Sequence, residues 1–142
     1  TGTPPHKDIE KTALGATSTV PWESGDTKKC IGDLKKKGVS VVGLEVCGRA
    51  IPYFDYSFVY PTALVVGNEI EGLDEGVLAL CDNVVSIPMM GMKESLNVAT
   101  AFGIVAYEML RQQLQKDPSL EDASVTSIKK RRGPAKRGRG TI

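Results

Sequence analysis

The chain has 142 residues, of which 41% are hydrophobic and 25% charged, proportions typical of a single soluble α/β domain. No run approaches the roughly 20 apolar residues of a membrane-spanning helix, and the N-terminus lacks a signal-peptide pattern, so the sequence argues against a membrane partner. The formal net charge of +1 hides an uneven distribution, because residues 129–139 hold seven of the eighteen basic residues and the rest of the chain carries −6.

The first part of the chain predicts two helical segments and a short extended one. Residues 9–16 predict one or two helical turns, and residues 17–22 predict a β-like segment. Residues 26–37 predict an amphipathic helix, with Asp26 as its N-cap and Gly38 as its end. Because the apolar face of this helix is narrow, we expect it to lie on the surface of a sheet.

Three buried strands are predicted further along the chain. Continuous runs of β-branched and apolar residues, without polar alternation, are typical of strands that are covered on both faces. Such runs lie at 39–46, 62–67 and 83–87. Residues 48–61, with their prolines and aromatic residues, predict a loop, and a short helix is expected from about Asp74.

The last predicted element is a long helix. Apolar residues recur at helical spacing from Leu96 to Leu114, and Pro118 ends the pattern. Beyond Pro118 the composition becomes polar and then basic, which predicts disorder. We therefore expect a domain over residues 1–116 and a tail over residues 117–142.

Strands that alternate with helices predict an α/β fold with a mainly parallel sheet and helices on both faces. In such sheets, ligands collect beyond the carboxyl ends of the strands. There the sequence places Gly67 and Glu69, and a loop that bends at Pro88 and leads to Ser95 and Asn97. Ser95 is expected as a helix N-cap and Asn97 in the first turn, both facing the same crevice as Glu69. A solvated glutamate and a merely capping serine are the alternatives.

The three cysteines, Cys30, Cys47 and Cys81, are scattered along the chain. No pair has the spacing of metal ligands, so no metal site is expected. We interpret them as buried thiols of a reduced intracellular protein.

Two stretches resemble motifs of a known family. "LVVGNEIEGL" at 64–73, followed by "IPMMGMKESLNVATAFGIVAYE" at 87–108, resembles motifs two and three of the SpoU (TrmH-type) RNA ribose 2′-O-methyltransferases of the SPOUT superfamily. "PPHKDIEKTALGATSTVPW" at 4–22 is similar to the segment that precedes these motifs in many bacterial-type members. The resemblance covers residues 3–113.

The resemblance implies a fold in which the C-terminal segment threads through a loop and forms a trefoil knot, a rare exception to unknotted chains. It also implies that the knotted loops hold S-adenosylmethionine, largely through backbone groups, and that the protein is a homodimer with its last helix at the interface. The implied cofactor-binding positions here are Leu44, Glu45, Gly67, Ile87, Leu96 and Val98.

The activity implied is methyl transfer to a ribose 2′-hydroxyl of tRNA or rRNA. Such a displacement requires alignment of the hydroxyl with the methyl group and removal of its proton. Glu69, Ser95 and Asn97 match the family's functional positions and would position the nucleotide and the group that accepts the proton.

The family's upstream motif, which carries an Asn and an Arg, has no counterpart in this sequence. We therefore expect an N-terminally incomplete domain that lacks one or two strands of the family's sheet. One alternative is a catalytically inactive, RNA-binding member of the same fold. Another is a generic nucleotide-binding α/β domain. This alternative is less favoured, because no glycine-rich phosphate-binding motif occurs at a strand–helix junction.

The basic tail fits an RNA partner, since clustered positive charge gives salt-dependent binding to phosphates without sequence preference. Alternatively, the tail is a targeting signal or only a solvated segment. We expect a cytoplasmic protein, and a nuclear or organellar location is the alternative that the basic tail leaves open. The candidate RNA-binding residues are Lys129, Lys130, Arg131, Arg132, Lys136, Arg137 and Arg139.

Overall fold

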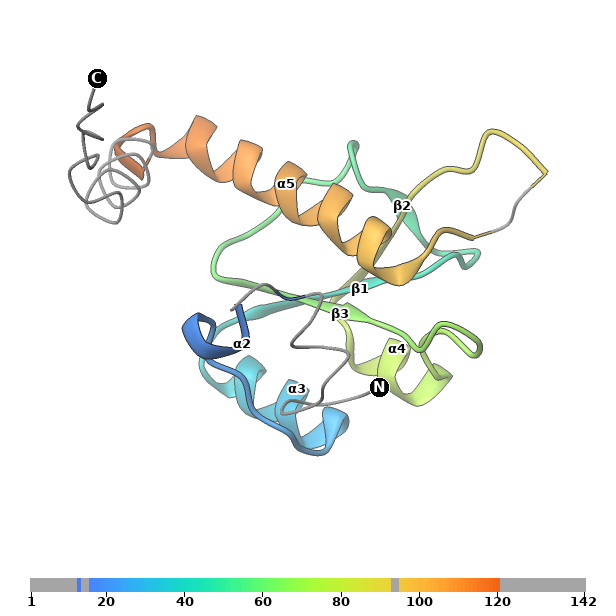
Figure 1. Ribbon diagram of the computed structural model, residues 1–142, viewed down its shortest axis with the longest axis horizontal. Coiled ribbons are helices and arrows are strands. Elements are labelled where there is room, and N and C mark those ends of the chain that lie inside the picture. The colour runs from blue at the N-terminus through green and yellow to red at the C-terminus, as the bar shows by residue number, and fades with distance from the viewer. Residues whose placement is uncertain (1–12, 14–15, 93–94, 121–142) are drawn as a thin grey trace, which may run out of the picture.

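The computed structural model describes Ala13 and residues 16–92 and 95–120. A four-stranded sheet, in the order β2-β4-β1-β3, forms the centre of the described chain, and all of its pairings are parallel (Figure 1). The parallel sheet predicted from the sequence is therefore confirmed. Its strands are β1 (Ser40–Leu44), β2 (Ile51–Pro52), β3 (Thr62–Val66) and β4 (Asn83–Ser86).

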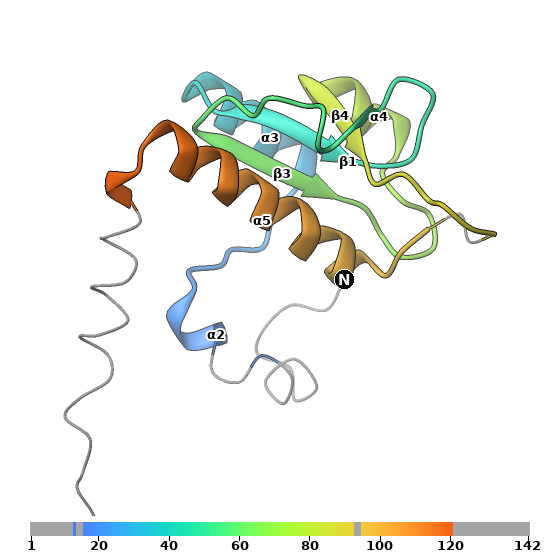
Figure 2. The same cartoon turned by 90° about the horizontal axis from the view of Figure 1, so that it is seen from above.

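Helices cover both faces of this sheet, as predicted. The helices of the described residues are α2 (Ala16–Thr19), α3 (Thr27–Lys36), α4 (Glu75–Leu80) and α5 (Val98–Lys116). The helices α3 and α4 lie on one face, and the long helix α5 crosses the other (Figures 1 and 2). In the described part of the chain, no helix is both long and apolar enough to cross a membrane.

Each face of the sheet has its own core, which explains why the strand sequences lack polar alternation. Successive side chains of a strand point to opposite faces, so Val41 packs beneath α3 and α4 while Val42 packs beneath α5. The first core contains Ile31, Val41, Val77 and Cys81. The second core contains Val42, Phe58, Val85 and Val105.

The predicted ends of α3 and the start of α4 are confirmed. The Asp26 carboxylate accepts a hydrogen bond from the N–H of Lys29 at 2.7 Å and caps α3. Gly38 follows this helix with a φ of 75°, a conformation that side chains disfavour. Asp74 caps α4 by accepting from the N–H of Val77 at 3.0 Å.

The β-like segment predicted over 17–22 is wrong. Residues Ala16–Thr19 form the short helix α2, and the N–H of Val20 donates to the carbonyl of Ala16 at 2.8 Å. Threonine and valine favour strands only where a neighbouring strand pairs with them, and none of the described strands pairs with this segment. The helical turns predicted over 9–16 lie largely outside the described residues.

The prediction of a pure loop over 48–61 is also wrong, because this segment contains β2. Ile51 and Pro52 pair in parallel with β4, and the N–H of Tyr53 continues the ladder to the carbonyl of Ser86 at 2.9 Å. Proline is tolerated because β2 is an edge strand. A strand of two residues carries no pattern that sequence analysis can detect.

The interpretation of all three cysteines as buried thiols is correct only for Cys81. Cys81 lies in the core beneath α3 and α4, where burial raises the pKa of its thiol. Cys47 is half-buried and Cys30 is exposed. Cys30 is turned outward because its neighbour Ile31 occupies the sheet-facing position of α3.

Hydrogen bonds fix α5 to the segment that follows β2. The side chain of Gln112 accepts from the N–H of Phe58 at 3.0 Å and donates to the carbonyl of Tyr56 at 2.9 Å. Lys116 donates to the carbonyl of Phe58 at 2.7 Å. These contacts set the position of α5 along its axis, and the helix ends at Lys116, two residues before Pro118, the predicted stop.

Candidate functional site

A cavity of ≈ 270 Å³ opens at the carboxyl ends of β1, β3 and β4, the edge where the sequence predicts a site. Figure 2 shows the ends of β1 and β3 on the same side of the molecule as the start of α5. Residues from these strand ends and from the first turn of α5 line the cavity. All six predicted cofactor-binding positions are among them, namely Leu44, Glu45, Gly67, Ile87, Leu96 and Val98.

One wall of the cavity is a tightly closed loop after β3. Asn68 and Gly72 exchange two backbone hydrogen bonds, of 3.0 and 2.9 Å, which join the two ends of the loop. The side chain of Asn68 also accepts from the N–H of Ile70 at 2.8 Å. This closed loop carries Glu69, Ile70 and Glu71 at its exposed tip, beside the cavity.

Two glycines permit the close approach of backbone that closes this loop. A Cβ at Gly67 would overlap the backbone carbonyl of Gly72, so the turn has no room for a side chain there. Gly72 has a φ of 68°, and a Cβ at this position would overlap the carboxylate of Glu45. The loop geometry therefore depends on both glycines.

Glu45 lies among the lining residues, but its carboxylate is occupied by the protein's own backbone. Its Oε2 accepts from the N–H of Leu73 at 2.8 Å, and its Oε1 accepts from the N–H of Val46 at 2.9 Å. The carboxylate thus connects the end of β1 with the end of the loop after β3. The sequence predicted a cofactor contact here and gave no sign of this bridge.

The roles predicted for Ser95 and Asn97 at the start of α5 need correction. The N-cap is Asn97 and not Ser95, because the helix begins at Val98. The side chain of Asn97 accepts from the N–H of Ala99 at 3.0 Å and of Thr100 at 3.3 Å. Ser95 lines the cavity with Glu69, whereas Asn97 is not among the lining residues.

The lining combines apolar walls with negative charge. Leu44, Ile87, Leu96 and Val98 supply apolar surface, while Glu45, Glu69 and Glu71 supply carboxylates, and the described lining contains no basic side chain. Such a cavity favours a ligand that has apolar parts and a cationic group. Within the described residues there is also no cluster of histidine, cysteine or acidic side chains that could hold a metal ion.

Comparison with known proteins identifies the family. The profile described as "SpoU rRNA Methylase family" matches residues 1–107. The chain belongs to the SpoU family. Over 103 residues it is 34% identical to the tRNA (guanosine(18)-2'-O)-methyltransferase of Aquifex aeolicus, a match that covers 70% of this chain and 49% of that protein. Over 106 residues it is 38% identical to the 23S rRNA (guanosine-2'-O-)-methyltransferase RlmB of Ralstonia nicotianae, covering 74% and 42%.

The fold is that of solved SpoU structures. The SpoU methyltransferase AviRb from Streptomyces viridochromogenes, in complex with the cofactor AdoMet, superposes with a TM-score of 0.65 at 31% identity. This superposition covers 73% of the present chain and 41% of that one. The chain therefore spans about half the length, or less, of the family members with which we compare it.

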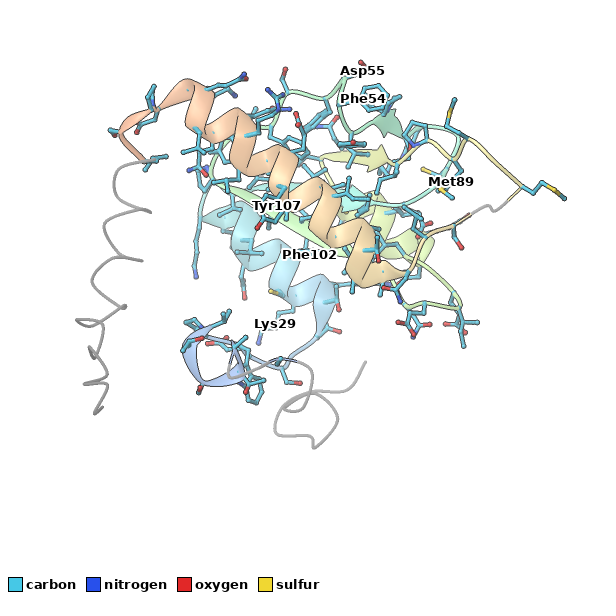
Figure 3. The ribbon with its side chains drawn as sticks, turned by 45° about the horizontal axis from the view of Figure 1, so that its top comes forward. Lys29, Phe54, Asp55, Met89, Phe102 and Tyr107 are labelled. Carbon is cyan, nitrogen blue, oxygen red and sulfur yellow. The ribbon has the colours of Figure 1, made fainter. Side chains whose placement is uncertain are left out.

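Several lining residues had no predicted role, among them Asn68 and Met89, and the sequence holds a signal for the first of these two. Asn68 closes the loop after β3, and asparagine is typical of turns because its side chain can bond to backbone two residues ahead. Met89 reaches the cavity from the loop after β4 and is labelled in Figure 3. Nothing in its sequence context separates it from its neighbour Met90. The basic residues of 129–139 lie outside the described residues.

Proposed function

We propose that this chain forms the cofactor-binding part of a SpoU enzyme that transfers a methyl group from S-adenosylmethionine to a ribose 2′-hydroxyl of tRNA or rRNA. The observation that carries the proposal is the convergence of all six implied cofactor positions on one cavity. Membership of the SpoU family and the activities named for its relatives also support the proposal.

The cavity suits S-adenosylmethionine in polarity and charge. The apolar side chains of Leu44, Ile87 and Leu96 offer surface for the adenine ring, and the strand ends offer backbone groups for its polar edge. The carboxylates of Glu69 and Glu71 lie at the mouth and favour a cationic ligand. When bound, the cofactor supplies a methyl group activated by its sulfonium charge.

The residues at this site have different roles in the proposed reaction. In this proposal, Glu69, at the tip of the closed loop, and Ser95, just before α5, orient the ribose, so that its 2′-hydroxyl lies in line with the methyl group. Asn97 acts by fixing the start of α5, which sets the positions of Leu96 and Val98. The knot implied by the resemblance stays a prediction.

We also propose a homodimer in which α5 lies at the interface. This helix exposes Phe102 (47%), Tyr107 (76%) and Leu110 (45%), an unusual amount of large apolar surface for a helix that packs on a sheet. Phe102 and Tyr107 lie along α5 in Figure 3. A groove between α5 and the start of β3 continues the apolar surface with Leu64 and Met109.

The RNA would be held mainly by positive charge outside the cavity, because the described cavity lining is acidic. We propose that residues 129–139 bind phosphates, with an affinity that falls steeply as salt rises. A location in the cytoplasm, where tRNA and rRNA are available, is part of this proposal.

Isothermal titration calorimetry with S-adenosylmethionine tests the cofactor site. The proposal predicts saturable binding of one cofactor per chain by the wild type, and much weaker binding by Gly67→Ala, in which the added Cβ overlaps the loop. Absence of binding by the wild type would refute the cofactor site. A catalytically inactive, RNA-binding member need not bind the cofactor, so RNA binding without cofactor binding would favour that alternative.

A further inference from the structure

We propose that Glu45 is a positioning residue, which holds the loop that carries Glu69 at the mouth of the cavity. The inference rests on the function proposed above, since it assigns that site a residue that acts without touching the ligand. It replaces the cofactor contact that the family resemblance implies for this position.

The bridge joins two segments that are far apart in the sequence. Glu45 follows β1, and the N–H that donates to its Oε2 belongs to Leu73, 28 residues further along the chain, at 2.8 Å. The N–H of Val46 holds the other carboxylate oxygen at 2.9 Å, which fixes the orientation of the carboxylate. The backbone N–H of Glu45 donates to the carbonyl of Val85 at 3.0 Å and anchors the residue to β4.

The loop transmits this restraint to Glu69. Because Asn68 and Gly72 are joined by two backbone hydrogen bonds, the residues between them move as a unit. Leu73 directly follows that unit, so a bond to its N–H fixes the position of the loop relative to β1. Gly72 allows the carboxylate to come this close, because any Cβ there would overlap it.

The carboxylate has one dedicated backbone donor on each oxygen, and within the described residues Glu45 forms no ion pair. The two backbone donors fix the direction in which this side chain points.

The test compares Glu45→Ala and Glu45→Gln with the wild type, and Glu23→Gln is the matched control on an exposed segment that does not line this cavity. Amide hydrogen exchange at Leu73, followed by NMR, reports the bridge, and calorimetry with S-adenosylmethionine reports the site. Glu45→Ala should speed exchange at Leu73 about tenfold or more and weaken cofactor binding about tenfold, or ~1.4 kcal/mol. Glu23→Gln should change neither.

The Glu45→Gln variant tests whether the hydrogen bonds of this side chain or its negative charge hold the loop. Its carbonyl oxygen can still accept from the N–H of Leu73, but its amide group would face the N–H of Val46, so only one of the two bonds survives. Glu45→Gln should therefore recover part of both the slow exchange and the affinity that Glu45→Ala loses.

Three results would overturn the inference. Unchanged exchange at Leu73 in Glu45→Ala would show that the bridge does not hold the loop. Faster exchange at Leu73 with undiminished cofactor affinity would show that the bond between Glu45 and Leu73 holds the loop but does not affect the cofactor site. Lost affinity with unchanged exchange would assign Glu45 to direct ligand contact. If the wild type itself fails to bind the cofactor, the proposed function falls, while the exchange measurement still decides whether Glu45 holds the loop.

Discussion

Gly67→Ala is the substitution for which the structure makes its sharpest prediction. The added Cβ would lie 2.5 Å from the backbone nitrogen of Leu73 and still closer to the carbonyl carbon of Gly72. Since atoms of this kind rarely approach within 3.4 Å, the loop after β3 would have to move by about 1 Å. The backbone cannot rotate out of the way as a flexible side chain would.

The expected cost follows from the bonds that this movement disturbs. It would stretch the pair of hydrogen bonds between Asn68 and Gly72, at 3.0 and 2.9 Å, and the bond from Leu73 to Glu45 at 2.8 Å. At about 1 kcal/mol for each hydrogen bond, the free energy of unfolding should fall by ~2–3 kcal/mol. Cofactor affinity should fall with it, because the same loop lines the cavity.

Urea unfolding and calorimetry measure the two effects. Gly32→Ala is the matched control, because a Cβ at Gly32 meets nothing within 4 Å and alanine is favoured inside α3 by ~1 kcal/mol. The control should therefore be as stable as the wild type or more stable. A Gly67→Ala protein that unfolds at the wild-type urea concentration and binds the cofactor normally would refute the account of this loop.

Three further predictions concern α5. Gln112→Ala should lower the free energy of unfolding in urea by ~1–3 kcal/mol, because the N–H of Phe58 loses its acceptor; an unchanged midpoint would contradict this. Hydrogen bonds from Arg111 and Gln112 lower the pKa of Glu108 from 4.5 to about 2, so its stabilising contribution is complete above pH 4.5 and is lost as pH falls toward 2. Glu108→Gln should therefore flatten that part of a stability–pH curve, and an equally steep loss of stability would show that Glu108 is not responsible. Leu110→Glu should convert the dimer to a monomer in analytical ultracentrifugation while Lys29→Glu on α3 does not, and the dimer proposal fails if the first variant stays dimeric.

Local chemistry explains why much of the fold could be predicted from the sequence. Val41 and Val42 belong to opposite cores, so a run of apolar residues was a reliable sign of a doubly covered strand. Asp26 and Asp74 cap helices through side chains that reach only three residues ahead. Gly67 could be recognised because a strand end next to a ligand site requires close backbone approach.

Features that depend on distant partners could not be predicted. The pairing of β2 depends on β4, which lies more than thirty residues later in the sequence. Whether Ser95 or Asn97 caps α5 depends on where the helix begins, and both residue types are good caps. The carboxylate of Glu45 can accept from the N–H of Leu73 only because the loop after β3 brings this residue next to the end of β1.

The most direct test of the proposed activity is mass spectrometry of nucleosides from tRNA and rRNA after incubation with the enzyme that contains this chain and isotopically labelled S-adenosylmethionine. For a SpoU enzyme of which this chain is the cofactor-binding part, we predict a labelled 2′-O-methylnucleoside that is strongly reduced by Gly67→Ala and Ser95→Ala. Label in a base rather than a ribose, or no labelled nucleoside from either RNA, would contradict the assignment of this chain to ribose methylation.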